Sequence, residues 1–352
     1  MAKGLHELVT EVLEQDLCTG CGMCVALCSN IIAVRERVAV IRDCRLVEGL
    51  CYTVCPRTET DVAPLEKQIF GGKERDPILG HYSKIAMSQA TNNTVRKVGQ
   101  YGGTITALAM LALELGIADG VLLVQKVEDG QYAARNVLAR SVKEVQACAG
   151  SKYTACPSLK QLSPVKQSGL KRIAVVGRPC QVIALRKLQF ANLEGTVAPE
   201  IRESVKLVIG LFCVWALEYR SFMDYLQQNL NTRNFTRIDI PKDAVVIERG
   251  TERIEVPYEE LKACRLRTCD ICEDMTAELA DISVGSTEWK DDWNTLIVRT
   301  EKGRELVEAA LASGVITLQD LPDERMKILK QAAKGKKERA RAELCTVRGH
   351  PR

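Results

Sequence analysis

The chain has 352 residues, of which 27% are charged and 46% hydrophobic, and this balance is typical of a folded protein rather than a disordered one. A net charge of only +4, with 5% aromatic residues, does not predict a surface that binds nucleic acid. The unusual feature is the presence of 15 cysteines beside only 3 histidines. No apolar secretion signal is visible at the start, so we expect a cytoplasmic protein whose clustered cysteines bind metal rather than form disulfides.

The first motif, "DLCTGCGMCVALCSN", places cysteines 18, 21, 24 and 28 at the spacing C-x2-C-x2-C-x3-C. This spacing is typical of ferredoxins, in which three thiolates hold one four-iron cluster and the fourth cysteine ligates another. In a two-cluster pattern, the missing ligand of the first cluster is a distant cysteine that precedes a proline. The sequence therefore predicts a first cluster held by Cys18, Cys21, Cys24 and Cys55.

The second half of this pattern, "DCRLVEGLCYTVCPR", is incomplete. A second cluster needs Cys28 and three further cysteines, but only Cys44 and Cys51 are found. Some ferredoxins carry Asp-Gly in place of the middle cysteine, and here Glu48 precedes a glycine at that step. A carboxylate is a harder ligand than a thiolate and binds iron less firmly. We predict a cluster with a labile iron, held by Cys28, Cys44 and Cys51 with Glu48 or solvent; the alternative is that this cluster is lost.

The rest of the chain divides by composition. Residues 1–62 are expected to form a small ferredoxin-like iron–sulfur domain, and residues 63–80, with two prolines and a Gly-Gly pair, a linker. Strand-like runs such as "GVLLVQKV" and "RIAVVG" alternate with helical ones across 81–300, which predicts an α+β or α/β domain with a mixed sheet. Residues 301–352 are expected to form a helical, basic tail with a solvated face, or alternatively a docking surface for an acidic partner. No stretch predicts a transmembrane helix.

Three loops of the central domain carry residues that suit a nucleotide. The first has a glycine pair at the start of an apolar helix, where backbone amides can approach a phosphate. The second offers a hydroxyl, an amine and an aromatic ring, and the third leads from a strand into a helix amino terminus that suits an anion. The residues concerned are Gly102, Gly103, Thr104, Ser151, Lys152, Tyr153, Gly177, Arg178, Pro179 and Gln181. The ordinary G-x-G-x-x-G dinucleotide motif is absent.

A further cysteine group lies in "CRLRTCDICEDMTAELADISVG", where Cys264, Cys269 and Cys272 follow the spacing C-x4-C-x2-C. Three cysteines so close can hold an iron–sulfur cluster if a fourth comes from elsewhere. Cys180, at the helix start in the third loop, is the best candidate for the fourth. Cys213 lies in an apolar run and is expected to be a buried structural cysteine, with ligation as the alternative.

Taken in order, the segments "GQYGGTITALAMLALELGIADGVLLV", "GSKYTACPSL", "VGRPCQVIALRKL", "GLFC" and "CDICEDMTAELADISVG" resemble the beta-subunit family of coenzyme F420 hydrogenases and dehydrogenases. The resemblance covers about residues 80–305. It implies that the three loops border FAD, that an inner cluster forms at Cys180, Cys264, Cys269 and Cys272, and that coenzyme F420 exchanges a hydride with the flavin. The cysteine-rich start is similar to that of formate dehydrogenase beta subunits or of the input subunits of reduced-F420 dehydrogenases.

A flavin handles hydrides as two electrons and iron–sulfur clusters carry electrons singly, so one chain with both converts between the two. The main hypothesis is an oxidoreductase subunit with FAD and about three [4Fe-4S] clusters. Its partner is expected to be the catalytic subunit of a formate dehydrogenase, hydrogenase or heterodisulfide reductase. The alternatives are a stand-alone reductase of an organic substrate, a relative linked to NADH, NADPH or ferredoxin, and a cluster scaffold without flavin. The sequence assigns no catalytic residue.

Overall fold

The computed structural model describes residues 3–127, 133–163, 169–191, 198–232, 235–240, 244–286 and 292–347. Its centre is one eight-stranded mixed sheet with the strand order β13-β3-β12-β11-β7-β6-β4-β5. Strands β11, β7, β6 and β4 run parallel to one another, and the other neighbours pair antiparallel. The strands are β3 (Lys84–Ala90), β4 (Gly120–Val127), β5 (Ala133–Ala139), β6 (Ile173–Gly177), β7 (Val205–Leu211), β11 (Ile282–Ser286), β12 (Asn294–Val298) and β13 (Ile316–Asp320). The expected α/β domain with a mixed sheet is confirmed.

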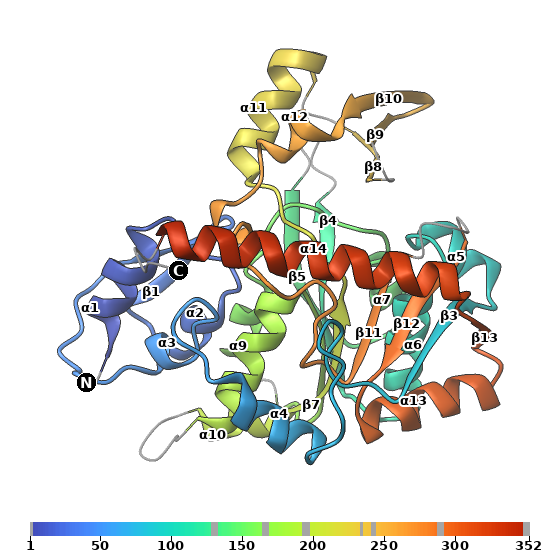
Figure 1. Cartoon of the computed structure of the whole chain (residues 1–352), viewed down its shortest axis with the longest axis horizontal. Helices are drawn as coiled ribbons and strands as arrows, with labels where there is room; N and C mark the ends of the chain where they lie inside the picture. Colours follow the sequence, from blue (N-terminus) through green and yellow to red (C-terminus); the bar gives the residue numbers. More distant parts are fainter. Residues whose placement is uncertain are drawn as a thin grey trace.

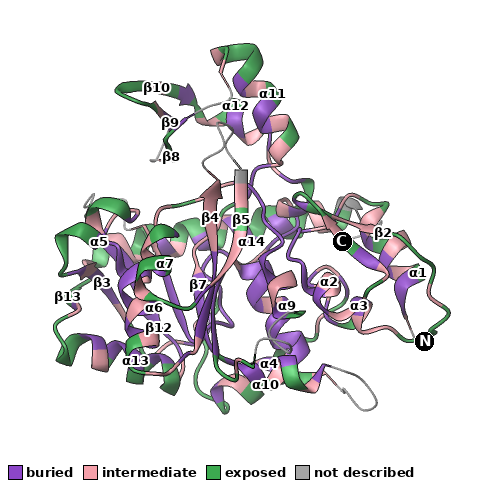
Figure 2. Ribbon diagram, turned by 180° about the vertical axis from the view of Figure 1, so that it is seen from behind, coloured by how far each residue is buried: buried purple, intermediate pink, exposed green. Residues whose placement is uncertain are grey.

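Side chains of the central strands alternate between two apolar cores, because successive residues of a strand point to opposite faces. Val121 and Leu123 of β4 belong to one core, and Leu122 belongs to the other. Figure 2 shows how β7 is buried between the helical layers. The first core is covered by α5 (Asn93–Val98), α6 (Thr104–Glu114), α7 (Val142–Ala147) and α13 (Glu301–Ala312). The second is covered by α9 (Pro179–Phe190), α10 (Pro199–Ser204) and the amino-terminal region.

The amino-terminal region is a set of short elements around a small core of Leu5, Leu8, Val12, Leu17 and Ile31. It also packs on the large domain, because Met23, Ala26 and Val54 are buried in the second core of the sheet. Its elements are α1 (Leu5–Leu8), η1 (Val9–Leu13), α2 (Met23–Leu27), β1 (Ile31–Val34), β2 (Arg37–Val40) and α3 (Leu50–Thr53).

The segment expected to be a linker, residues 63–80, has structure of its own. Helix α4 (Val62–Phe70) buries Leu65 and Phe70 in the second core, and Leu79 is fully buried. Asp61 caps the helix by accepting from the amide of Ala63, and the Gly-Gly pair then ends it in the left-handed conformation. Pro64 thus lies in the first turn of a docked helix and the Gly-Gly pair ends it, so this segment is not a free connection.

A subdomain formed by the part of the chain between β7 and Cys264 projects from the sheet, at the top of Figure 1. It packs helices against a three-stranded antiparallel sheet of order β10-β9-β8 and has its own core around Phe222 and Phe235. Its elements are α11 (Tyr219–Leu230), β8 (Arg237–Asp239), β9 (Ala244–Arg249), β10 (Glu252–Pro257) and α12 (Tyr258–Lys262). The run "RIDIPKDAVVIERG", expected in the main domain, thus belongs to a separate small sheet.

The carboxy-terminal part differs from a solvated tail. After α13, strand β13 forms one edge of the sheet, so the main domain extends past residue 300. The long helix α14 (Asp323–Val347) then crosses the molecule and ends beside the amino-terminal region (Figure 1). Leu329 and Ala333 pack near its start and Leu344 packs against the amino-terminal core. Among the described residues, no helix has the length and apolar character needed to cross a membrane.

Candidate functional site

The four cysteines predicted to hold the first cluster lie together. Negative charge on Cys55 raises the pKa of Cys18, Cys21 and Cys24. Negative charge on Cys18 or Cys21 also raises the pKa of Cys24. Burial raises the pKa of Cys21 to about 12, with a further rise from Cys55. Lys187 of α9 supplies a buried ammonium, which donates to the Cys55 carbonyl at 2.7 Å. The structure thus brings these thiols near one another, with the Lys187 ammonium beside Cys55.

Two glycines allow the tight loop between these cysteines. Gly20 and Gly22 both have positive φ, at +61° and +86°, where a side chain is strained. A Cβ on Gly20 would lie 1.9 Å from the carbonyl oxygen of Glu36, so only glycine fits. The Gly20 amide turns toward sulfur and lies 3.4 Å from Cys18 Sγ.

Cys28, Cys44 and Cys51, which we call the outer thiols, also come together. Burial raises the pKa of Cys51 to about 11, and negative charge on Cys28 or Cys44 adds to this rise. Glu48, the predicted fourth ligand, is exposed. It follows Leu46 and Val47, whose side chains are 69% and 73% exposed. The outer thiols therefore lie beside a loop that few other groups cover.

A small cavity deeper in the chain, the inner thiol pocket, is lined by Cys180, Cys213, Cys269 and Cys272. Cys180 stands in the first turn of α9, and Cys213 follows β7. Cys269 ends the short helix η3 (Arg267–Cys269), and its sulfur accepts from the amide of Ala216 at 3.3 Å. Four thiols from three distant parts of the chain thus face one space.

The structure does not bring Cys264 to this pocket, although the sequence grouped it with Cys269 and Cys272. The Cys264 thiol instead lies 3.6 Å from the Ser221 carbonyl and packs in the core of the projecting subdomain. The reason is the end of α12, after which the chain turns between Cys264 and Cys269. Cys213, expected to be structural, occupies the fourth position at the pocket.

Three cations line the inner thiol pocket: Arg57, Arg178 and Lys336. Arg57 comes from the amino-terminal region and donates to Thr268 Oγ1 at 2.7 Å. Arg178 precedes α9, and its charge acts on Cys180, Cys213 and Cys269. Lys336 comes from α14 and is buried. Positive charges from three separate elements thus converge on these four thiols.

The cations change the acidity of one thiol. Burial alone would raise the pKa of Cys272, but the charges of Lys336 and Arg57 outweigh burial and leave its pKa below the ordinary value. A thiol must lose its proton to ligate a metal, so this environment favours the ligating form. Burial raises the pKa of Cys213 to about 12.

The thiols of the inner thiol pocket can be compared with the ligands of a single ion and of a cluster. Among the described residues, no three cysteine, histidine or carboxylate side chains are close enough to hold one metal ion. A four-iron cluster is larger than one ion and spreads its four thiolates more widely. Four cysteine thiolates are the donor set of such a cluster, so the residues of the inner thiol pocket fit it.

A second, much larger cavity of about 490 Å³ lies at the end of the sheet, above the first turns of α6 and α9. This volume is typical of pockets that hold a cofactor or other small molecule. Predicted residues that line it are Gly103, Thr104, Ser151, Lys152, Tyr153, Arg178 and Gln181. Gly102, Gly177 and Pro179 do not line it: Pro179 borders the inner thiol pocket, and Gly102 packs against β3 and β12.

Several lining residues had no signal in the sequence. Trp215, Tyr258 and Ile240 come from the projecting subdomain and its neck, and Arg325 and Ile328 from α14. They reach the cavity through long-range packing, which no local motif reports. Gln100 and Tyr101 both donate to Asp239 Oδ1, at 2.6 and 3.0 Å, and so tie the subdomain to the loop before α6.

Two of the predicted binding residues have structural partners. Lys152 donates to the carbonyl oxygens of Cys148, Ala149 and Gly150, at 2.5, 2.8 and 2.8 Å, and so caps the end of α7. Burial lowers the pKa of Lys152 to about 8. Gln181 donates to Ser158 Oγ at 2.7 Å. Both side chains shape the wall of the cavity through these bonds.

The two cavities share part of their walls, because Arg178 and Cys213 line both of them. Negative charge on Cys180 raises the pKa of Cys21, and negative charge on Cys51 raises the pKa of Cys24. Thr19 and Arg57, which neighbour first-cluster cysteines in the chain, line the inner thiol pocket, and Cys24 and Cys55 pack around the same small core as the outer thiols. The large cavity, the inner thiol pocket, the first-cluster thiols and the outer thiols therefore form a series of neighbouring sites. This series is suited to moving single electrons between a cofactor and the surface.

Two models of one family match the chain, and both carry the description "Coenzyme F420 hydrogenase/dehydrogenase, beta subunit". The model of the amino-terminal part matches residues 86–163, and the model of the carboxy-terminal part matches residues 170–324. The chain is 31% identical over 279 residues to a coenzyme F420 hydrogenase subunit beta of Methanococcus voltae, a match that covers 76% of this chain and 95% of that one. The chain therefore belongs to the family of coenzyme F420 hydrogenase and dehydrogenase beta subunits.

Two further relatives show how far the similarity extends. A coenzyme F420-dependent sulfite reductase of Methanocaldococcus jannaschii is 30% identical over 337 residues, which are 93% of this chain. The chain spans only 51% of that protein, or about half its length. In a solved structure of the F420-reducing [NiFe] hydrogenase complex from Methanosarcina barkeri, one chain matches with a TM-score of 0.72 and 26% identity. The match covers 77% of this chain and 94% of that chain, which supports the same architecture.

Proposed function

We propose that this chain is the electron-transfer subunit of an oxidoreductase complex. FAD is held in the large cavity, and [4Fe-4S] clusters at the inner thiol pocket and the first-cluster thiols carry electrons onward. The third, outer cluster has a labile iron. The soluble hydride carrier is coenzyme F420, as the names of its relatives suggest.

One observation carries this proposal: Arg178 and Cys213 line both the large cavity and the inner thiol pocket. A group in the large cavity would then be separated from a cluster by a single layer of side chains. Electron transfer between cofactors needs such proximity, and a protein that only stored clusters would not need a cavity of about 490 Å³ beside them.

A bound flavin would accept a hydride as two electrons and release them singly to the clusters. The residues of the chain supply the environment for this exchange. Trp215, Tyr153 and Tyr258 form an aromatic side of the cavity that can stack on a ring and exclude water. The Arg178 guanidinium lies between the two cavities, where it can stabilise negative charge on either side.

The inner cluster is proposed to be held by Cys180, Cys213, Cys269 and Cys272, with Cys213 in place of Cys264. The catalytic partner is a separate subunit of the formate dehydrogenase, hydrogenase or heterodisulfide reductase type. The alternative is a stand-alone reductase, favoured by the similarity to a sulfite reductase that is about twice as long as this chain.

The test is cofactor content combined with a matched pair of variants. The anaerobically purified chain should release about one FAD on denaturation. In the native chain, reduced coenzyme F420 should reduce the bound flavin faster than NADH or NADPH does. Ala149 lines the large cavity, whereas the nearby Ala147 is exposed and outside it. Ala149→Trp should lower the FAD content, and Ala147→Trp should not. Release of FMN, or of no flavin, would overturn the proposal.

A further inference from the structure

Lys336 of α14 reaches the inner thiol pocket from a part of the chain far from any cysteine motif. Its side chain is buried, with an exposed fraction of 4%, and lines the pocket beside the four thiols. Its ammonium donates to the carbonyl oxygens of Cys213 at 2.6 Å and Asp274 at 2.8 Å. These two bonds fix the charge beside both cysteine segments, so Lys336 does not belong to a solvated helix face.

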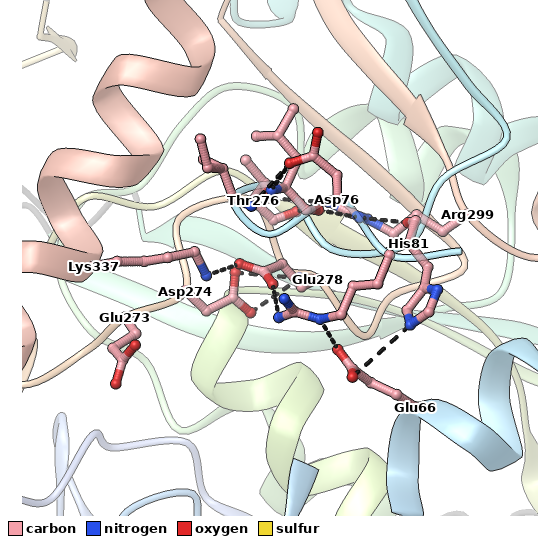
Figure 3. A network of polar contacts seen from close by, with 12 residues as sticks. Glu66, Asp76, His81, Glu273, Asp274, Thr276, Glu278, Arg299 and Lys337 are labelled. Carbon is pink, nitrogen blue, oxygen red and sulfur yellow. Dashed lines mark hydrogen bonds and ion pairs between the residues drawn. The ribbon is translucent and has the colours of Figure 1, made fainter. Parts of the chain in front are cut away.

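The next residue on the helix provides a contrast. Lys337 is also buried, but it pairs with the carboxylate of Glu278, as Figure 3 shows. Glu278 in turn pairs with Arg75 at 3.2 Å, within a network that extends to Glu66. The Lys337 ammonium is thus paired with a carboxylate, whereas the Lys336 ammonium is bonded to two uncharged carbonyls. The charge of Lys336 interacts at longer range with Cys272, Cys213, Asp274 and Cys269.

A fixed cation next to an iron–sulfur cluster favours its reduced form, because the reduced cluster carries one more negative charge. The effect is strong where the cluster is buried and water cannot screen the charge. Reduction here adds one electron, and no bond is formed or broken. The family model ends at residue 324, so Lys336 lies outside the part of the chain that the family model describes.

We propose that Lys336 raises the reduction potential of the inner cluster, so that this cluster accepts electrons from the flavin side. Lys336 acts on the cluster through its positive charge and does not ligate iron. The inference rests on the proposed function, because it requires a cluster at the inner thiol pocket.

The experiment is a redox titration of the purified holoprotein, followed by electron paramagnetic resonance. The variants are Lys336→Gln, Lys336→Arg and Lys337→Gln. Glutamine keeps two N–H donors for the two carbonyls but removes the charge. At a fixed potential, Lys336→Gln should lower the ratio of reduced to oxidised inner cluster about tenfold, which corresponds to about 59 mV for one electron. Lys336→Arg should stay near the wild type, and Lys337→Gln should shift the ratio much less.

An unchanged ratio in Lys336→Gln with full iron content would overturn the inference, and so would an equal shift in Lys337→Gln. If Lys336→Gln does not accumulate, Asp274→Asn gives a test of opposite sign. It removes a negative charge that acts on both Lys336 and Cys272, so it should raise the reduced fraction. Absence of that rise would also overturn the inference. The proposed function fails separately, if the wild type has no inner-cluster signal and Cys272→Ala loses no iron.

Discussion

The inner thiol pocket and the outer thiols are built in opposite ways. The inner pocket draws Cys180, Cys213 and the 269–272 segment from distant parts of the chain and adds three cations. The outer thiols lie within 24 residues of one another, beside an exposed loop that contains Leu46 and Val47. Long-range packing has gathered four thiols and three cations around one pocket in the first case. A local motif has left three thiols and an exposed carboxylate in the second.

The difference suggests that the inner and outer sites have different roles in electron transfer. Burial and fixed cations favour an inner cluster that is stable and easily reduced, since water and oxidants are kept away. An exposed site exchanges electrons with a partner more readily but loses iron more easily. The variants below test each half of this comparison.

The largest effect is expected from the ligands of the inner pocket. Cys213→Ala should remove about four irons per chain and slow electron transfer between flavin and the amino-terminal clusters, because no carboxylate among the described residues lines the inner pocket to replace the lost thiolate. Cys264→Ala is the matched control, since Cys264 packs in the projecting subdomain. Iron and sulfide analysis would measure the loss. If Cys264→Ala loses iron and Cys213→Ala does not, the inner ligand set proposed from the structure is incorrect.

The outer thiols should show the opposite property, a labile iron. Mild air oxidation should produce the electron paramagnetic resonance signal of a three-iron cluster, because a carboxylate or solvent binds the fourth iron weakly. Glu48→Cys should abolish that signal by completing the thiolate set. Val47→Cys adds a thiol at the neighbouring exposed position and should leave the signal in place. Iron content unchanged by Cys28→Ala, with no three-iron signal in the wild type, would mean that no outer cluster exists.

The framework around the inner pocket should depend strongly on Arg299. This buried guanidinium donates to the carbonyls of Leu79 and His81, at 2.8 Å each, and to Thr276 Oγ1 at 2.9 Å. Arg299→Met should lower the free energy of unfolding by about 3–5 kcal/mol, because buried acceptors lose their partner. Arg304→Met, on the exposed face of α13, should cost less than about 1 kcal/mol. Urea unfolding of both variants gives the comparison, and equal losses would contradict it.

The smallest effect concerns pH and Glu278, which anchors α14 over the inner pocket. Burial raises the pKa of Glu278 to about 6, with a further rise from Asp274. Between about pH 4.3 and 6 the folded chain keeps a proton that the unfolded chain has released. Stability therefore falls as pH rises through this window, by at most about 2 kcal/mol. Urea midpoints at several pH values should show this fall in the wild type and a smaller one in Glu278→Gln.

The sequence was informative where neighbouring residues alone define a feature. The C-x2-C-x2-C-x3-C spacing predicted that Cys18, Cys21 and Cys24 lie close together, and they do, with Cys24 in the first turn of α2. The apolar runs at 120–127 and 173–177 are strands of the sheet, as predicted. Sequence proximity misled where the chain folds back on itself. Cys264 lies near Cys269 in sequence, but the end of α12 directs its thiol into another core.

Other features depend on contacts that leave no local pattern. The basic run of the carboxy-terminal helix has the composition of a solvated face, yet Lys336 and Lys337 are both buried. Their partners, the Cys213 carbonyl and the Glu278 carboxylate, are more than 50 residues away. The prolines and glycines of residues 63–80 likewise indicate chain reversals, but not whether the helix between them docks.

Helix α14 also bears on the order in which the protein is made. It borders the large cavity through Ile328, the inner thiol pocket through Lys336 and the amino-terminal core through Leu344. Because a ribosome delivers the chain from its amino terminus, this helix emerges after every cysteine that lines a pocket. Until it docks, the inner thiol pocket lacks the wall that Lys336 supplies. A cluster inserted at the proposed site before that point would be enclosed when α14 docks.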